Sequence, residues 1–205
     1  MISNGTLRLS DCVAIANYTD LILPNSLFMS SKLIKLAQDY IEKNWIEVTN
    51  RGIEVKIARD VSEFSNEDYK DITIEPFLGG MNTIYAGIRL GDLGDGIQNY
   101  IIARMLYELV NPAILLWDNV EAHFNPRILV KIAEWFYEIA EREKQVVLTT
   151  HSLEATKIIG GTCEDFVKIY ILDLKNGVLN SKEISVEEIE GEYEEAGIDV
   201  RMSPL

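Results

Sequence analysis

The stretch AILLWDNVEAHFNP, residues 113–126, opens with five apolar residues and then turns acidic at Asp118. A short, continuously apolar run is typical of a strand that is buried on both faces of a parallel sheet. Pro126 favours the first turn of a helix, and apolar residues recur at helical spacing over residues 126–143. The stretch therefore predicts a strand, a turn and a helix, with a carboxylate at the end of the strand. The predicted buried residues of this helix are Ile128, Leu129, Ile132, Trp135, Phe136 and Ile139.

Helices and strands alternate on both sides of this stretch. Residues 95–110 predict a helix with Ile97, Ile101, Met105 and Leu109 on one face. After residue 143 the pattern predicts two further strands, a short helix closed by glycine, a hairpin, and a last helix that begins with a capping box at Ser185 and Glu188. These strands are QVVLTT (145–150), expected to be buried, and FVKIYILDL (166–174); the short helix covers 152–161, and the hairpin LKNGVL covers 174–179. Strands separated by helices indicate an α/β fold with a parallel sheet flanked by helices over residues 91–205.

The first 90 residues have a different pattern and predict an α+β arm. Residues 29–45 carry Leu33, Ala37 and Ile41 at helical spacing, with Ser30 and Ser31 as cap candidates. Residues 45–57 alternate apolar and polar side chains around Asn50, Arg51 and Gly52, which predicts a hairpin. Residues 71–90 predict two more short strands around Gly79 and Gly80.

Composition narrows the class of protein. The chain has 205 residues, 47% of them hydrophobic, and a net charge of −14. A phosphate backbone repels so acidic a surface, and the lysines and arginines form no basic patch, so we do not expect this chain to bind nucleic acid directly. The cysteines, Cys12 and Cys163, fit no metal spacing, and no apolar run approaches the ~18 residues that span a bilayer. We therefore expect a cytoplasmic protein.

Three groups of residues are candidates for chemistry. Asp118 ends one strand, with Glu121 close by, and His151 ends the next, so both strand ends present polar groups at one edge of the sheet. An aspartate there can hold hydrated Mg²⁺ beside a substrate phosphate. Alternatively, Asp118 caps the following turn and His151 is an ordinary loop histidine. The glycines in residues 89–98 precede a helix, where backbone N–H groups form an anion site, although an ordinary tight turn has the same pattern.

LGDGIQ, ILLWDNVEAHFNP and VVLTTHS, in this order, resemble the C-terminal lobe of an ABC-type ATPase. The resemblance covers residues 80–200 and is nearest to the AAA-domain subgroup related to chromosome-maintenance and abortive-infection ATPases. It implies that Leu93, Gly94, Asp95 and Gly96 form the signature loop, which reads the γ-phosphate of ATP held by a second protomer. It also implies that Asp118 is the Walker B aspartate, which acts on Mg²⁺ through water. His151 is then the switch histidine, and His123 and Asn125 lie in the D-loop, near a dimer partner.

The sequence departs from the family pattern at two places. It contains no G-x-x-x-x-G-K-[ST] loop, the Walker A cradle for phosphate. Asn119 stands where the family has its catalytic carboxylate, and loss of a general base typically costs ~10²–10⁴-fold in rate. Glu121 is a candidate substitute. The resemblance therefore implies ATP and Mg²⁺ as cofactors, a complementary lobe or chain that carries the Walker A loop, and a nucleotide-dependent dimer.

Two further interpretations stay open. In the first, the chain has given up hydrolysis and acts as a catalytically inactive ATPase-like binding or regulatory module, as Asn119 and the missing loop suggest. In the second, Asp118, Glu121, His123 and His151 form the metal site of an unrelated hydrolase. In the preferred interpretation the isolated chain is inactive and hydrolyses ATP only when a Walker A lobe complements it.

Overall fold

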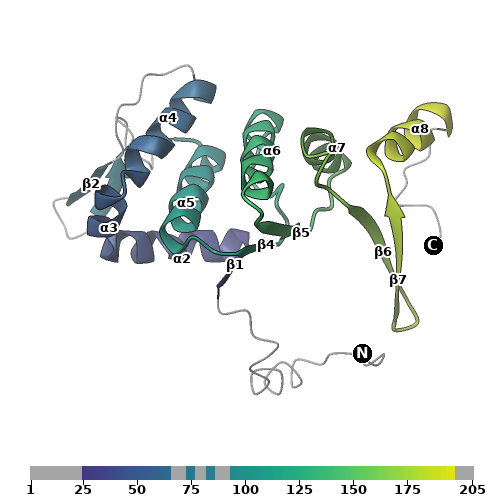
Figure 1. The fold of residues 1–205 in the computed structure, drawn as a ribbon, viewed down its shortest axis with the longest axis horizontal. Coiled ribbons are helices and arrows are strands. Elements are labelled where there is room, and N and C mark those ends of the chain that lie inside the picture. Colours follow the sequence, from purple (N-terminus) through teal and green to yellow (C-terminus); the bar gives the residue numbers. More distant parts are fainter. Residues whose placement is uncertain (1–24, 66–72, 77–81, 86–92, 197–205) are drawn as a thin grey trace. The chain divides into compact units, whose positions relative to one another are not determined.

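The computed structural model describes residues 25–65, 73–76, 82–85 and 93–196 (Figure 1). The strands in this part of the chain are β1 (Ser26–Met29), β2 (Thr73–Pro76), β3 (Asn82–Tyr85), β4 (Ile114–Trp117), β5 (Gln145–Leu148), β6 (Ile169–Lys175) and β7 (Val178–Ile184). The helices are α2 (Ser31–Lys43), α3 (Trp45–Asn50), α4 (Ile53–Ser65), α5 (Asp95–Val110), α6 (Pro126–Glu141), α7 (Leu153–Thr162) and α8 (Val186–Ala196). None of the described helices is long and apolar enough to cross a membrane.

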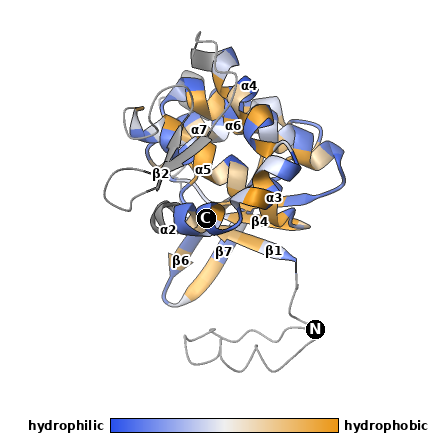
Figure 2. Cartoon of the chain, turned by 90° about the vertical axis from the view of Figure 1, so that its left-hand side faces the viewer, coloured by the Kyte–Doolittle hydropathy of each residue, from blue (hydrophilic) through white to orange (hydrophobic). Residues whose placement is uncertain are grey.

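The central sheet has the order β1-β4-β5, and β4 and β5 are parallel. Leu115 and Trp117 of β4 are buried, whereas the alternating Ile114 and Leu116 are only half-buried. Figure 1 shows α5, α6 and α7 side by side along one side of β4 and β5, and Figure 2 shows the apolar stretches of α5 and β4 in orange. The predicted α/β fold with a parallel sheet and flanking helices is confirmed.

The predicted helix after β4 is confirmed in its start and its core, and it ends at Glu141, two residues before the predicted end. α6 begins at Pro126, and Asn125 caps it by accepting a hydrogen bond from the Ile128 N–H at 3.0 Å. The six residues predicted to be buried have exposed fractions of 0–4%: Ile128, Leu129, Ile132, Trp135, Phe136 and Ile139. The predicted helix 95–110 also forms as α5, which is buried on more than one face.

The hairpin predicted over residues 45–57 is wrong, because this segment forms α3 and the start of α4. The alternation Ile-Glu-Val-Lys-Ile places Ile53 and Ile57 four residues apart, which fits one face of a helix as well as a strand. Val61 continues the same face, and all three side chains are buried. Gly52, with φ of +61°, makes the turn between the two helices. The two strands predicted within residues 71–90 are confirmed as the antiparallel pair β2 and β3.

Three predictions after residue 143 need correction. β5 was expected to be buried but is half-exposed, and Val147 is 46% exposed. Residues 166–174 were expected to give a strand of the parallel sheet, but β6 pairs with β7 in a separate antiparallel hairpin. The short helix does not stop at its glycines, since α7 continues to Thr162.

By its internal packing the chain divides into a unit Leu27–Phe166 and a second unit that includes Val167–Leu205. In the second unit, Asn176 and Gly177 both have positive φ, which suits the tight turn of the hairpin. The predicted capping box forms: the Ser185 N–H donates to Glu188 at 2.9 Å, and the Glu188 N–H donates to the Ser185 hydroxyl at 3.2 Å. The domain boundary predicted near residue 90 stays a prediction, because residues 86–92 lie outside the described part.

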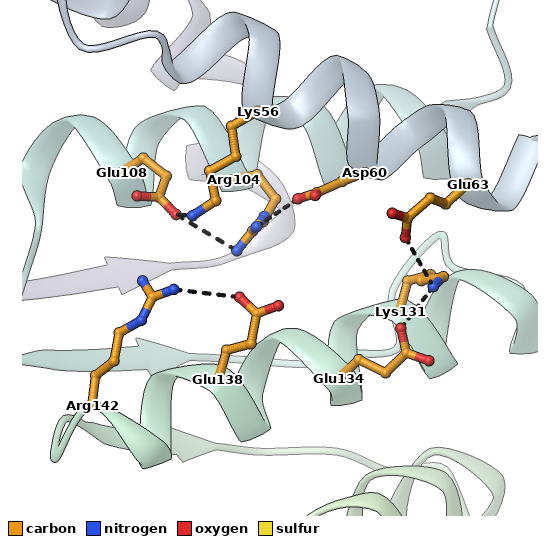
Figure 3. A network of polar contacts seen from close by, with 9 residues as sticks. All are labelled: Lys56, Asp60, Glu63, Arg104, Glu108, Lys131, Glu134, Glu138 and Arg142. Carbon is orange, nitrogen blue, oxygen red and sulfur yellow. Dashed lines mark hydrogen bonds and ion pairs between the residues drawn. The ribbon is translucent and has the colours of Figure 1, made fainter. Parts of the chain in front are cut away.

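A polar network ties α4 to α5 within the first unit (Figure 3). The Arg104 side chain is 2% exposed, and its Nη2 lies 2.5 Å from Asp60 Oδ2. Arg104 also lies 4.7 Å from the centre of the Trp135 ring, and Lys56 binds Glu108 at 2.6 Å. Ion pairs, one of them with the buried Arg104, therefore anchor α5 to α4 in addition to apolar packing. α5 is the helix that follows the predicted signature loop.

Candidate nucleotide-binding site

Asp118 lies directly after β4, at the carboxyl end of the central strand. Its N–H donates to the Met29 carbonyl at 2.9 Å, which extends the link between β4 and β1 by one residue. Its carboxylate Oδ1 accepts a hydrogen bond from the Thr149 hydroxyl at 2.7 Å. The position therefore agrees with the predicted strand end, and the carboxylate is turned toward the segment that follows β5.

The turn after Asp118 contains two residues with left-handed backbone conformation. Asn119 has φ of +54° and His123 has φ of +72°. Asparagine and histidine adopt this region more readily than most residues, so the sequence suits the turn. Phe124 packs against Trp117 with ring centres 6.0 Å apart. Asn125, predicted to lie near a dimer partner, holds the start of α6 with its side chain.

The segment after β5 is fastened to this turn by hydrogen bonds. The backbone N–H of His151 donates to Glu121 Oε1 at 2.9 Å, and the Val120 N–H donates to the Thr149 carbonyl at 3.1 Å. Burial alone would raise the pKa of Glu121, but the hydrogen bond from His151 holds it below its ordinary value. Asp118, Glu121 and His151 therefore come together at one edge of the sheet, through contacts between residues about 30 positions apart.

The glycine turn before α5 approaches the same region. Gly94 is the N-cap residue of α5, and the Gln98 side chain closes the turn by donating to the Leu93 carbonyl at 2.6 Å. A Cβ atom on Gly96 would lie 2.7 Å from the His123 carbonyl oxygen and 2.9 Å from Ile128 Cδ1. The absence of a side chain at this position lets the helix start pack directly on the turn that follows β4.

The predicted residues thus fall into two groups. In the first group the Thr149 hydroxyl binds Asp118 and the His151 backbone N–H binds Glu121, and in the second Gly96 lies against His123. Asp95 is exposed in the first turn of α5. The roles of all these residues in binding or catalysis stay predictions.

The residues present suit a cation held through water better than one held by a cage of ligands. A single carboxylate at a strand end, with a hydroxyl beside it, is the kind of site in which Mg²⁺ keeps most of its water. Among the described residues, no three His, Cys, Asp or Glu side chains are grouped to hold a metal ion. This finding contradicts the metal-hydrolase interpretation, because Asp118, Glu121, His123 and His151 are all described.

Thr149 is the residue at this site that the sequence interpretation missed. Its hydroxyl donates to Asp118 and accepts the Asn119 N–H at 3.0 Å. The available signal was the pair of threonines between an apolar strand and His151, since hydroxyls at a strand end are free to bond across to the neighbouring strand. Cys163, in contrast, is a buried thiol whose pKa is raised by burial. Cys12 lies outside the described residues.

Comparison with known proteins gives a family and a fold. A family model described as "AAA domain, putative AbiEii toxin, Type IV TA system" matches residues 17–156. No match was found among curated proteins. One similar structure comes from work on the ATP-driven dimerization and DNA-stimulated activation of SMC ATPases. It is 19% identical with a TM-score of 0.50, and the match covers 75% of this chain and 98% of that chain.

Two further structures are SMC head domains. The Pyrococcus yayanosii head with its coiled coil and joint is 20% identical with a TM-score of 0.49, and the match covers 78% of this chain and 32% of that chain. The Thermotoga maritima head is 14% identical with a TM-score of 0.48, over 89% of this chain and 63% of that chain. The chain therefore spans less than two thirds of either structure. The fold of the chain is that of a P-loop NTPase similar to an SMC head.

Proposed function

The chain belongs to the AAA-domain family of AbiEii-type proteins, whose members are nucleotide-binding ATPase domains, and from this premise we propose that it is the C-terminal lobe of an ABC-type ATPase. In this proposal the loop Leu93–Gly94–Asp95–Gly96 is the signature loop, and Asp118 acts on Mg²⁺ through water. His151 senses the γ-phosphate, and His123 and Asn125 face a dimer partner. A Walker A loop on a complementary lobe or chain holds the phosphates, so turnover requires both parts.

The observation that carries the proposal is the meeting of three separate segments at one sheet edge. Asp118 after β4 and His151 after β5 are joined through Thr149 and Glu121, and the glycine turn before α5 packs on the turn between them. In α/β sheets ligands bind beyond the carboxyl ends of the strands, where these segments lie. A carboxylate, an imidazole and a helix start are the groups that a Mg²⁺-bound triphosphate would meet there.

The open edge of β5 supports the proposal that a complementary lobe completes the sheet. In the described part of the chain β5 pairs only with β4, so its other edge presents unpaired backbone groups. In the same part of the chain β6 pairs with β7 and not with β5. Val147 lies opposite Leu116 in the parallel register and is 46% exposed, so the same face of the sheet is also open. A phosphate loop comes with a strand before it and a helix after it, which would fit this edge and this face.

The solved relatives support a nucleotide-dependent dimer. The structural work cited above concerns ATP-driven dimerization of SMC ATPases, and this chain covers 98% of that structure. In our proposal two copies of the assembled ATPase enclose the nucleotide, and the exposed Asp95 and His123 lie at the surface between them. In this proposal the dimer forms with ATP.

Asn119 favours a second candidate function, a module that binds nucleotide without turnover. The side-chain amide of Asn119 cannot take a proton from water as a carboxylate does. The backbone N–H of Asn119 donates to the Thr149 hydroxyl at 3.0 Å. In this alternative the chain joins its complementary lobe and assembles with ATP, but it does not hydrolyse it. The two candidates share the same site and differ only in whether another carboxylate activates water.

The test is ATP hydrolysis and ATP binding, measured for the pure chain and for the chain mixed with a polypeptide that carries the Walker A strand, loop and helix. We expect no turnover by the chain alone and nucleotide binding by the mixture. Asp118→Ala should lower the Mg²⁺-dependent part of that binding, while Glu154→Ala, an exposed carboxylate on α7, should not. Mg²⁺-dependent hydrolysis by the pure chain would contradict the proposal. Turnover by the mixture that appears only with Asn119→Glu would identify the binding module.

A further inference from the structure

Two side chains join the end of β4 to the end of β5 at the point where the backbone ladder stops. The paired register ends at Trp117 and Leu148. Beyond it, the Thr149 hydroxyl donates to Asp118 Oδ1 at 2.7 Å and accepts the Asn119 N–H at 3.0 Å. One turn further along, Glu121 Oε1 accepts the His151 N–H at 2.9 Å. These bonds cross between two loops that carry the predicted functional groups.

We propose that Thr149 and Glu121 are positioning residues of the nucleotide site, a role that rests on the proposed function. Thr149 fixes the orientation of the Asp118 carboxylate by occupying Oδ1, which leaves Oδ2 for a water of a hydrated cation. Glu121 fixes the start of the His151 loop by holding its backbone. Beyond the ladder the backbone adds two bonds between these segments: the Thr149 N–H donates to the Trp117 carbonyl at 2.9 Å, and the Val120 N–H donates to the Thr149 carbonyl at 3.1 Å. Neither of them holds the Asp118 carboxylate or the His151 backbone.

The geometry gives Glu121 a holding role rather than that of the base in place of Asn119. One of its two oxygens accepts a backbone N–H at 2.9 Å. The turn that carries Glu121 is closed by backbone bonds of its own: the Ala122 N–H donates to the Asn119 carbonyl at 3.0 Å and the Phe124 N–H to the Glu121 carbonyl at 3.1 Å. An acceptor needs only an oxygen at this place, whereas a base needs a carboxylate. Glutamine keeps the first property and loses the second, so the two roles can be separated.

The first experiment measures amide hydrogen exchange at His151 in the chain itself. Loss of a hydrogen bond to a charged group should make Glu121→Ala exchange about 10- to 100-fold faster at this amide. Glu121→Gln should stay within about threefold of the unsubstituted chain, because its amide oxygen still accepts the bond. Glu154→Ala, which removes a nearby exposed carboxylate, is the control. Unchanged exchange in Glu121→Ala, or equal acceleration in both variants, would overturn the role of Glu121.

The second experiment applies the same logic to Thr149. Thr149→Val keeps the shape and removes the hydroxyl, so the Asn119 amide should exchange about 3- to 10-fold faster. Thr149→Ser keeps the hydroxyl and should restore slow exchange. Thr162→Val, which loses a hydroxyl bonded within α7, controls for hydroxyl removal elsewhere. If serine does not restore the exchange rate, the hydroxyl is not what positions this turn.

A third measurement separates this inference from the proposed function. With the complementary Walker A lobe and Mg²⁺-ATP, Thr149→Val and Glu121→Ala should bind nucleotide more weakly than the unsubstituted chain, and Thr149→Ser and Glu121→Gln should recover binding. If the unsubstituted chain and its complement bind no nucleotide, the proposed function fails. In that case the positioning of Asp118 and His151 is still decided by the exchange rates, which need no nucleotide.

Discussion

Replacing Asp60 by alanine tests how firmly α4 is anchored to α5. Asp60 Oδ2 is 2.5 Å from Nη2 of Arg104, whose side chain is 2% exposed. Without Asp60, the charge of Arg104 would remain buried against Trp135, with Glu108 as the nearest remaining carboxylate at 3.7 Å. The buried guanidinium would thus lose its closest partner.

The expected cost follows from burial and from the remaining partner. Removing one member of a buried ion pair typically costs about 3–5 kcal/mol, because an uncompensated charge stays in the interior. The Asp60 side chain is 25% exposed, and Glu108 compensates Arg104 in part, so we expect about 2–3 kcal/mol for Asp60→Ala. Arg104→Met in the same chain removes the stranded charge and should return more than half of that loss.

Urea unfolding followed by tryptophan fluorescence measures this effect. Trp45, Trp117 and Trp135 are the three tryptophans of the chain, and all belong to the unit Leu27–Phe166. At an m value of about 2 kcal/mol/M, the unfolding midpoint should fall by about 1 M or more. Glu63→Ala on the same helix is the matched control. The Glu63 carboxylate lies 3.7 Å from the Lys131 ammonium group, and the Glu63 side chain is 59% exposed. Loss of this ion pair should therefore change the free energy of unfolding by no more than about 0.5 kcal/mol. Equal midpoints for the two variants would refute the reasoning.

Three further predictions concern the same unit. The pKa of Glu108 lies below its ordinary value of 4.5, because Lys56 and Arg104 outweigh the effect of burial. The stability that ionised Glu108 contributes above pH 4.5 should therefore be lost as the pH falls through the lowered pKa. If urea midpoints are measured between pH 6 and pH 3, they should depend less on pH in Glu108→Gln than in the unsubstituted chain. Gly96→Ala should cost about 1–3 kcal/mol in urea unfolding, since its Cβ would press on the His123 carbonyl, whereas Gly94→Ala meets nothing within 4 Å and serves as the control. Asn125→Ala should cost about 1 kcal/mol by removing the cap of α6; equal stability of the two chains would show that the cap contributes nothing.

The sequence predicts the segment from β4 to α6 closely because several local signals agree there. A continuous apolar run, a proline and an asparagine cap all favour the same strand, turn and helix, and the six expected core residues are buried. In residues 53–65 the local signals do not favour a single structure. Their alternation fits a short strand, and only the longer spacing of Ile53, Ile57 and Val61 identifies α4. A window of five residues is too short to separate the two periods.

The burial of β5 could not be predicted from its own residues. The run of apolar residues is typical of a strand covered on both faces, but burial depends on what lies beside and above the strand. In the described part of the chain β5 is an edge strand, and Val147 is 46% exposed. The sequence of β5 is therefore that of a covered strand, although in the described part of the chain the strand is exposed at an edge. We expect this mismatch if another polypeptide segment completes the sheet.

The candidate site shows the same division between local and long-range information. Residue type and position were enough to place Asp118 and His151 after neighbouring strands, because polar residues that follow apolar strands are visible in the sequence. Their roles stay predictions. The bonds that join them depend on the parallel register of β4 and β5, since that register decides that Thr149 faces Asp118 and Glu121 faces the His151 N–H. A shift of one residue in this register would turn Thr149 away from Asp118. The geometry of the site is thus a consequence of the sheet, and a complementary lobe that pairs with β5 would act directly on the strand that positions His151.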